Sequence, residues 1–177
     1  MKELLDKLSS YNLFNYLLPG VLFAAIGERV TSYSLLEKDI VVGVFVYYFI
    51  GLIISRIGSP IIEPFFKAVK FVRFAPYQDF VRASQTDTKL EVLSETNNTY
   101  RTFCSLFTAL VNLKLYENLE KSHPESFLHS TTLVLCLLLV LFCFSYRKQT
   151  TYITERIAAT LDEGKTSGTH SDTNKEE

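Results

Sequence analysis

A run of 21 residues without a formal charge, residues 126–146, constrains this chain more than any other feature. Its centre, residues 133–142, is entirely apolar, and Arg147 and Lys148 follow the run directly. A bilayer core is about 30 Å thick, so a helix rising 1.5 Å per residue needs roughly 20 apolar residues to cross it. A helix that is apolar on every face rarely fits a small soluble domain. The run therefore predicts a transmembrane helix.

Three further segments resemble spans less strongly. We place the predicted spans at about 10–27, 40–56, 102–116 and 127–146. The first contains Pro19, which removes a backbone donor and is expected to kink the helix. The third has only 12 uncharged residues between Arg101 and Lys114. Hydropathy alone is equally compatible with a surface amphipathic helix there, so its assignment depends on topology.

The basic residues favour four spans with both termini in the cytoplasm. Under that arrangement the outside loops hold four basic residues, and the other 14 of the 18 lie inside. The four are Arg29, Lys38, Lys114 and Lys121. Cytoplasmic segments of membrane proteins carry this excess of Lys and Arg. We expect an all-α integral membrane four-helix bundle over residues 1–161, with a cytoplasmic amphipathic connector at 57–101 and a disordered tail at 162–177.

One face of the second predicted span is suited to close helix packing. Gly43, Tyr47, Gly51 and Ser55 recur every four residues and therefore share a face. Mostly small residues at this spacing let helices approach closely in lipid. The contact lies either within one subunit or between subunits, and the pattern does not distinguish them.

Three amides fall within the predicted spans, namely Asn12, Asn15 and Asn112. An amide in a bilayer has to find a hydrogen-bond partner on another helix or in water. Asn12 and Asn15 are three residues apart and share a face. They either hold helices together or line a pore formed by several copies.

The first half of the connector, residues 61–73, combines an apolar face with basic residues. Ile62, Phe65, Val69 and Val72 share one side of a helix that is expected to end before Pro76. The basic residues on the other side are Lys67, Lys70 and Arg73. A basic, aromatic-rich helix beside a span is typical of segments in the headgroup layer, attracted to anionic lipids. The same residues are also candidates for contact with a cytosolic protein.

No pattern in the sequence indicates catalysis. The three cysteines, Cys104, Cys136 and Cys143, form no metal-ligand spacing, and no Gly-rich phosphate loop is present. A net charge of −1 gives no reason to expect direct nucleic-acid binding. We therefore expect a protein that is not an enzyme and needs no cofactor or metal.

The layout resembles small multi-pass membrane components of bacterial anti-phage defence systems, such as the membrane subunit of the Kiwa system and membrane effectors of retrons. The features that carry the resemblance are the spans around 17–20, 43–55 and 133–146 with a basic cytosolic connector. The resemblance implies sensing of envelope disturbance, recruitment of a cytosolic partner, or permeabilisation of the membrane.

We accordingly expect a non-enzymatic component of the bacterial inner membrane in an antiviral defence or stress system. It would act as a homo-oligomeric sensor or scaffold with a cytosolic partner and anionic lipids. The alternative is a pore-forming effector that depolarises the host cell on activation. A third hypothesis is a structural or regulatory membrane subunit unrelated to defence.

Overall fold

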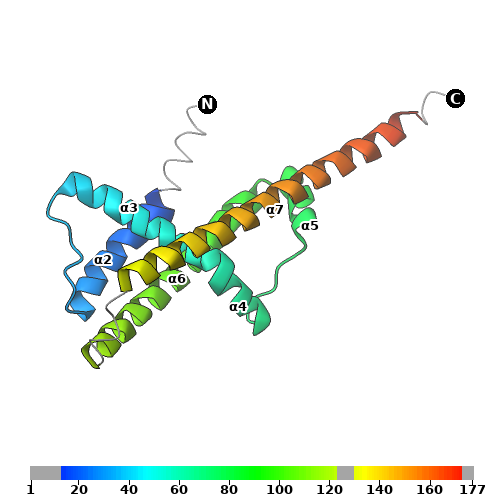
Figure 1. Cartoon of the computed structure of the whole chain (residues 1–177). Helices are drawn as coiled ribbons and strands as arrows, with labels where there is room; N and C mark the ends of the chain where they lie inside the picture. The colour runs from blue at the N-terminus through cyan, green and yellow to red at the C-terminus, as the bar shows by residue number, and fades with distance from the viewer. Residues whose placement is uncertain (1–12, 123–129, 173–177) are drawn as a thin grey trace.

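The described part of the computed structural model, residues 13–122 and 130–172, consists of eight helical elements and contains no strand (Figure 1). The predicted all-helical fold is therefore confirmed. In chain order the elements are the π-helix η1 (Leu13–Leu17), α2 (Leu18–Val30), α3 (Ile40–Ile57), the π-helix η2 (Gly58–Ile62), α4 (Glu63–Ala68), α5 (Tyr77–Thr86), α6 (Lys89–Ser122) and α7 (Ser130–Asp172).

Three of the described stretches are long and apolar enough to cross a membrane: Leu13–Val30, Ile40–Ala68 and Leu133–Ala158. The predicted span 102–116 is not among them and forms the middle of α6, which begins at Lys89. α7 continues to Asp172, whereas the sequence predicts disorder from residue 162. Polar helical extensions such as these carry no hydropathy signal, so composition makes them look like loops or tails.

Both π-helical segments lie at a proline. Pro19 follows η1 by two residues, and Pro60 lies within η2. Proline has no N–H to donate to the preceding turn, and the backbone widens locally to a π-turn. The expected irregularity at Pro19 is thus a π-helix that leads into α2.

Helices α2 and α3 cross at two glycines and splay apart toward the segment that connects them, residues 31–39 (Figure 1). A Cβ added to Gly51 would overlap the Tyr16 carbonyl group, and one added to Gly20 would overlap the Tyr47 carbonyl group. Only glycine permits two backbones to approach this closely. The crossing also brings Tyr16 against Tyr48, with ring centroids 5.5 Å apart at a near-perpendicular angle.

α6 completes a three-helix unit by packing on α2 and α3. Its Leu106 and Leu110 are buried with Ile54 of α3, and Leu22, Phe23 and Ile26 of α2 pack against this cluster. The side chains of Ser105 and Leu106 on α6 are fully buried. α6 therefore runs beside membrane-length helices even though it is not strongly apolar itself.

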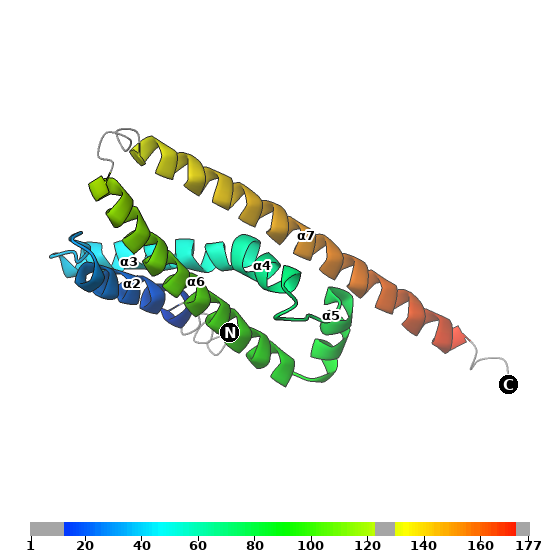
Figure 2. The same ribbon diagram turned by 90° about the horizontal axis from the view of Figure 1, so that it is seen from below.

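α7 runs in the opposite direction to α6 and leaves most of its apolar surface uncovered (Figure 2). It contacts α3, η2 and α5. Only 6% of the apolar stretch that starts at Leu133 is buried, and Leu135 and Leu139 are each more than 60% exposed. The chain thus forms an α2–α3–α6 unit with α7 beside it, and the predicted four-helix membrane bundle is not confirmed.

The amphipathic connector helix is shorter than predicted, because α4 ends at Ala68 rather than near Pro76. Lys70 has a left-handed backbone (φ 59°), and the Phe71 N–H reaches back to the Phe66 carbonyl. Together with the bond from Lys70 N–H to the Lys67 carbonyl, this is the Schellman ending of a helix. The Phe66 and Phe71 rings pack 5.2 Å apart across it. Lysine at a position that usually requires glycine hides this ending from sequence inspection.

Candidate functional site

A single buried carboxylate, Glu63, joins three helices. Its side chain is 5% exposed and lies at the start of α4. Glu63 Oε1 accepts a hydrogen bond from Lys67 Nζ at 2.8 Å, and Oε2 accepts one from Arg101 of α6 at 2.7 Å. Lys148 Nζ of α7 lies 3.3 Å from Oε2 and donates to the Ser59 carbonyl at 2.9 Å. We call Glu63, Lys67, Arg101 and Lys148 the Glu63 cluster.

The Glu63 cluster holds three cations against one carboxylate, which leaves positive charge in excess. Arg101 also keeps a buried donor, Nε, for which the described residues supply no acceptor. The side chains of Arg101 and Lys148 are 22% and 24% exposed, and that of Lys67 is 46% exposed. A cation that is largely removed from water normally pairs fully or binds a ligand, because an uncompensated charge there is unfavourable. This cluster therefore resembles an anion site more than a closed structural ion pair.

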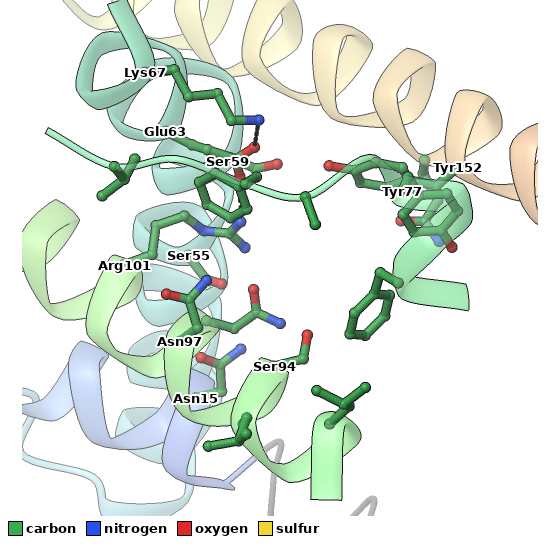
Figure 3. Close-up of a pocket in the computed structure, with 18 of the residues that line it drawn as sticks. Asn15, Ser55, Ser59, Glu63, Lys67, Tyr77, Ser94, Asn97, Arg101 and Tyr152 are labelled. Carbon is green, nitrogen blue, oxygen red and sulfur yellow. Dashed lines mark hydrogen bonds and ion pairs between the residues drawn. The ribbon is translucent and has the colours of Figure 1, made fainter. Parts of the chain in front are cut away.

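A cavity of about 1040 Å³ opens beside the cluster. Figure 3 shows Glu63, Lys67 and Arg101 on one side of it and Tyr77 with Tyr152 on the other. Its walls come from η1, α3, η2, α4, the segment 72–75, α5, α6 and α7. Segments separated by many residues in the sequence thus enclose one space, which is lined by basic, amide and aromatic side chains.

A second polar group lies next to the cavity, between the three packed helices. The Thr102 hydroxyl of α6 is 3.1 Å from Asn15 Oδ1 of η1 and 3.4 Å from Ser55 Oγ of α3. The same oxygen is 2.9 Å from the Asn98 carbonyl. Asn15 and Thr102 are 3% and 1% exposed, so this contact links helices within one chain.

The other two predicted intramembrane amides do not join this group. Asn112 is exposed and donates to the Thr108 carbonyl of its own helix at 2.8 Å. Asn12 lies outside the described residues. The structure therefore places one amide of the predicted pair, Asn15, at an intrachain contact.

The predicted packing face of α3 divides into two halves. Gly51 and Ser55 contact η1 and α6 as described above. Gly43 lies near the Glu37 side chain, and the Tyr47 hydroxyl accepts a hydrogen bond from the Glu37 N–H at 2.7 Å.

The predicted basic residues of the connector have three different environments. Lys67 pairs with Glu63 and lies 4.4 Å from the centre of the Phe74 ring. Arg73 lines the cavity. Lys70 is exposed at the left-handed turn. Beside them Phe65, Val69 and Phe71 are each more than half exposed, a surface compatible with insertion into a headgroup layer.

A second carboxylate cluster lies at the opposite end of α6. Glu117 is 1% exposed and contacts Lys114 and Lys121 of its own helix at 2.7 and 2.6 Å. It also accepts hydrogen bonds from the N–H and hydroxyl of Ser32 at 2.8 and 2.6 Å. Hydrogen bonds from Lys114, Lys121 and Ser32 hold the pKa of Glu117 well below its usual range. We call these four residues the Glu117 cluster.

Sequence inspection missed Glu63 as the centre of a site. One signal was available, because Glu63 is the only acidic residue between Asp39 and Asp79 and lies among Arg56, Lys67 and Arg73. Its partners Arg101 and Lys148 are 38 and 85 residues away, a separation that no local pattern can bridge.

We compared the chain with protein-family models, curated proteins and solved structures, and none of them matches.

Proposed function

We propose that this protein is an integral protein of the bacterial inner membrane, with four crossings and both termini in the cytoplasm. The direction of the helices supports four crossings. α2 and α6 run from the Glu63 cluster toward the Glu117 cluster, whereas α3 and α7 run back. If α7 crosses a bilayer from the end at which α6 finishes, then α6 has to cross as well. The 14-to-4 distribution of basic residues supports the same arrangement, with the Glu63 cluster on the cytoplasmic side.

The function that this geometry supports best is a non-enzymatic, homo-oligomeric sensor or scaffold that connects the membrane to a cytosolic partner. The observation that carries it is the Glu63 cluster, which ties α7 and α6 to the end of the α3–α4 helix. Beyond this cluster α5, the first turns of α6 and the last turns of α7 extend as polar helices. A displacement among the spans would move that polar surface, which is the part accessible to a partner.

The oligomer is supported by the uncovered apolar face of α7. Leu133, Leu137 and Val140 are each about half exposed or more. In a bilayer this face contacts lipid or another copy of the chain, and close helix packing is the usual basis of association in lipid. Chemical cross-linking in native membranes is expected to yield discrete oligomers.

The role in antiviral defence or stress rests on the layout that resembles Kiwa and retron membrane components. Its test is the plating efficiency of phages on cells that express the chain together with its genomic neighbours. Resistance that disappears on deletion of the chain supports defence. Unchanged plating across a broad phage panel rejects it.

Reporter fusions test the topology. Fusions after Glu91 and after Lys175 are expected to report cytoplasm, and a fusion after Lys38 is expected to report the outside.

Partner binding is tested by charge reversal at Lys70 and Arg73, with Lys38→Glu as the matched control on the other side of the membrane. A cytosolic protein cross-linked to the parent and to Lys38→Glu, but lost from the double variant, supports the scaffold.

A pore that depolarises the host cell is the second candidate. Asn15 is buried against Thr102, and this contact favours a packing role for the amide over a pore lining. Dye release from liposomes separates the two. A pore requires leakage that Leu at both Asn12 and Asn15 abolishes without loss of insertion, whereas a scaffold gives no leakage in the parent.

A further inference from the structure

The cavity beside Glu63 has an excess of positive charge. Among the described residues, four cations line it, and Glu63 is the only acidic residue in its lining. They are Arg56, Lys67, Arg73 and Arg101. Lys67 and Arg101 share Glu63 with Lys148, and neither Arg56 nor Arg73 forms an ion pair with a carboxylate of the described residues. Guanidinium groups bind phosphate oxygens with paired, charge-assisted hydrogen bonds.

We propose that this cavity binds a soluble phosphate ester with an aromatic body, that is, a nucleoside phosphate. The phosphate lies toward the arginines, and the ring lies toward the aromatic wall. This inference goes beyond the proposed scaffold function and does not depend on the identity of a protein partner.

The wall opposite the arginines is aromatic. Tyr77 of α5 and Tyr152 of α7 stack with ring centroids 5.1 Å apart and planes inclined by 26°. The Phe80 ring lies 6.4 Å from that of Tyr77 and also lines the cavity. Aromatic faces of this kind stack on nucleobases without sequence preference. Figure 3 shows this wall facing the Arg101 side of the space.

Amides lie between the two walls. Asn97 and Asn98 line the cavity from α6, and Gln149 lines it from α7. Each amide offers both donors and an acceptor, which suits a sugar hydroxyl or the edge of a base. Pockets for small molecules usually measure about 300–1,000 Å³. The cavity volume of about 1040 Å³ is therefore sufficient for a nucleotide.

The positions of the cations relative to the apolar and aromatic residues along α6 and α7 favour a soluble ligand over a phospholipid. On α6, Leu90 and Leu93 precede Arg101 by two to three turns, and on α7, Tyr152 follows Lys148 by one turn. On each helix the cation therefore lies between these apolar or aromatic residues and the apolar core, which is Leu106 and Leu110 on α6 and the run 133–142 on α7. A phospholipid headgroup at the arginines would place its acyl chains on the opposite side, toward the spans. The aromatic wall instead suits a ligand that enters from the aqueous side.

Nucleotide binding to the full chain in neutral phosphatidylcholine nanodiscs tests the proposal. The probes are fluorescently labelled adenosine and guanosine triphosphates, followed by fluorescence anisotropy. At least one is expected to bind saturably, and the unlabelled nucleotide is expected to displace it more effectively than inorganic phosphate does.

Matched variants locate the site. Arg73→Gln and Arg56→Gln should each weaken binding about tenfold, that is, by about 1.4 kcal/mol, because each loses a charge-assisted hydrogen bond to the phosphate. Lys70→Gln removes an equal charge from an exposed position outside the cavity and should change binding by about twofold at most. Tyr152→Leu should weaken binding about fivefold or more, because the stacking surface is lost, whereas Tyr146→Leu on the same helix should not.

Three results overturn the proposal. They are the absence of saturable binding by either probe, equal weakening by Lys70→Gln and Arg73→Gln, and displacement of a bound probe by phosphatidic acid in the nanodisc but not by unlabelled nucleotide. The last result reassigns the cavity to a lipid headgroup. None of them bears on the topology or cross-linking experiments, so the cavity and the scaffold fail independently.

Discussion

Glu63 and Glu117 are both buried carboxylates with several cationic contacts, yet one stabilises the packing between helices and the other stabilises a single connecting segment. The cations on Glu117 come from its own helix, three residues before and four residues after it. Its distant partner among the described residues is Ser32, in the segment that follows α2. Two of the three cations on Glu63 come from other helices, α6 and α7. The Glu117 cluster therefore fastens one connecting segment, whereas the Glu63 cluster sets how α4, α6 and α7 are arranged.

The strongest test of this difference is Glu63→Gln. Removal of the carboxylate leaves Arg101 and Lys148 without their shared counter-charge in a largely buried place. Breaking a buried ion pair costs about 3–5 kcal/mol, and a loss of this size is expected in the free energy of unfolding in detergent micelles. The distance between spin labels on α4 and α7 should also become larger and broader.

Glu91→Gln, an exposed change on α6, serves as the control and should leave both measurements at the parent values. If Glu63→Gln unfolds like the parent, the Glu63 cluster does not set the helix arrangement. Glu63 and Glu117 would then both stabilise only local structure.

The second test concerns the helix crossing that lies at the Glu63 end of α3. Gly51→Leu forces the helices apart, because even a Cβ there overlaps the Tyr16 carbonyl group. Overpacking of this kind costs about 1–3 kcal/mol. Unfolding in micelles should report the loss, and Asn15 should lose its contact with Thr102.

Gly43→Leu is the matched control on the same face of α3. A Cβ there meets the ring of Tyr47 at 3.2 Å, and a flexible side chain can move away. Equal stability of the two variants would mean that the crossing at Gly51 is not required. A change of oligomeric state in Gly51→Leu alone would instead indicate a contact between subunits.

Local patterns in the sequence were enough to predict the helical fold and the membrane-length stretches. The apolar run before Arg147 and the small face of α3 depend only on neighbouring residues, and periodicity reports such features directly. Both fall in helices of the structure, and Gly51 lies at a helix crossing. The helical segments could be predicted because the pattern that marks a helix spans only a few turns of neighbouring residues.

The features that the sequence did not predict depend on distant residues or on an unusual residue choice. The Glu63 cluster unites positions 63, 101 and 148, and the cavity adds α5. The end of α4 uses Lys70 where glycine is usual, so no local signal marks it. Composition left the start of α6 open between a polar loop and an exposed helix, because the two have the same composition. Tertiary contacts therefore decide the Glu63 cluster and the cavity, whereas the end of α4 is a local turn formed by an unusual residue.

A third prediction addresses the Glu117 cluster. Because its cations lower the pKa of Glu117, the stabilisation is complete above the ordinary value of 4.5 and is lost as the pH falls below it. The protection factor of the Ser32 amide, which is the intrinsic exchange rate divided by the observed rate at the same pH, should fall on acidification, while global unfolding changes little. In Glu117→Gln this protection factor should be low already at neutral pH and should not fall further in acid. An acid-dependent protection factor that persists in this variant would assign the effect to another group.

The smallest expected effect is that of Tyr33→Phe, which acts on the same connecting segment. The Tyr33 hydroxyl donates to Glu120, and this hydrogen bond raises the pKa of Tyr33 from 10.0 to about 12. Since the neutral phenol is the bound form, its stabilisation is complete below pH 10 and is lost as the pH rises through about 12. The chain has ten tyrosines and no tryptophan, so ultraviolet absorbance follows tyrosine ionisation alone. Tyr33→Phe should remove a step near pH 12 from that titration. If the step near pH 12 persists in this variant, the Glu120 contact does not hold the segment, and Glu117 alone stabilises this end of the molecule.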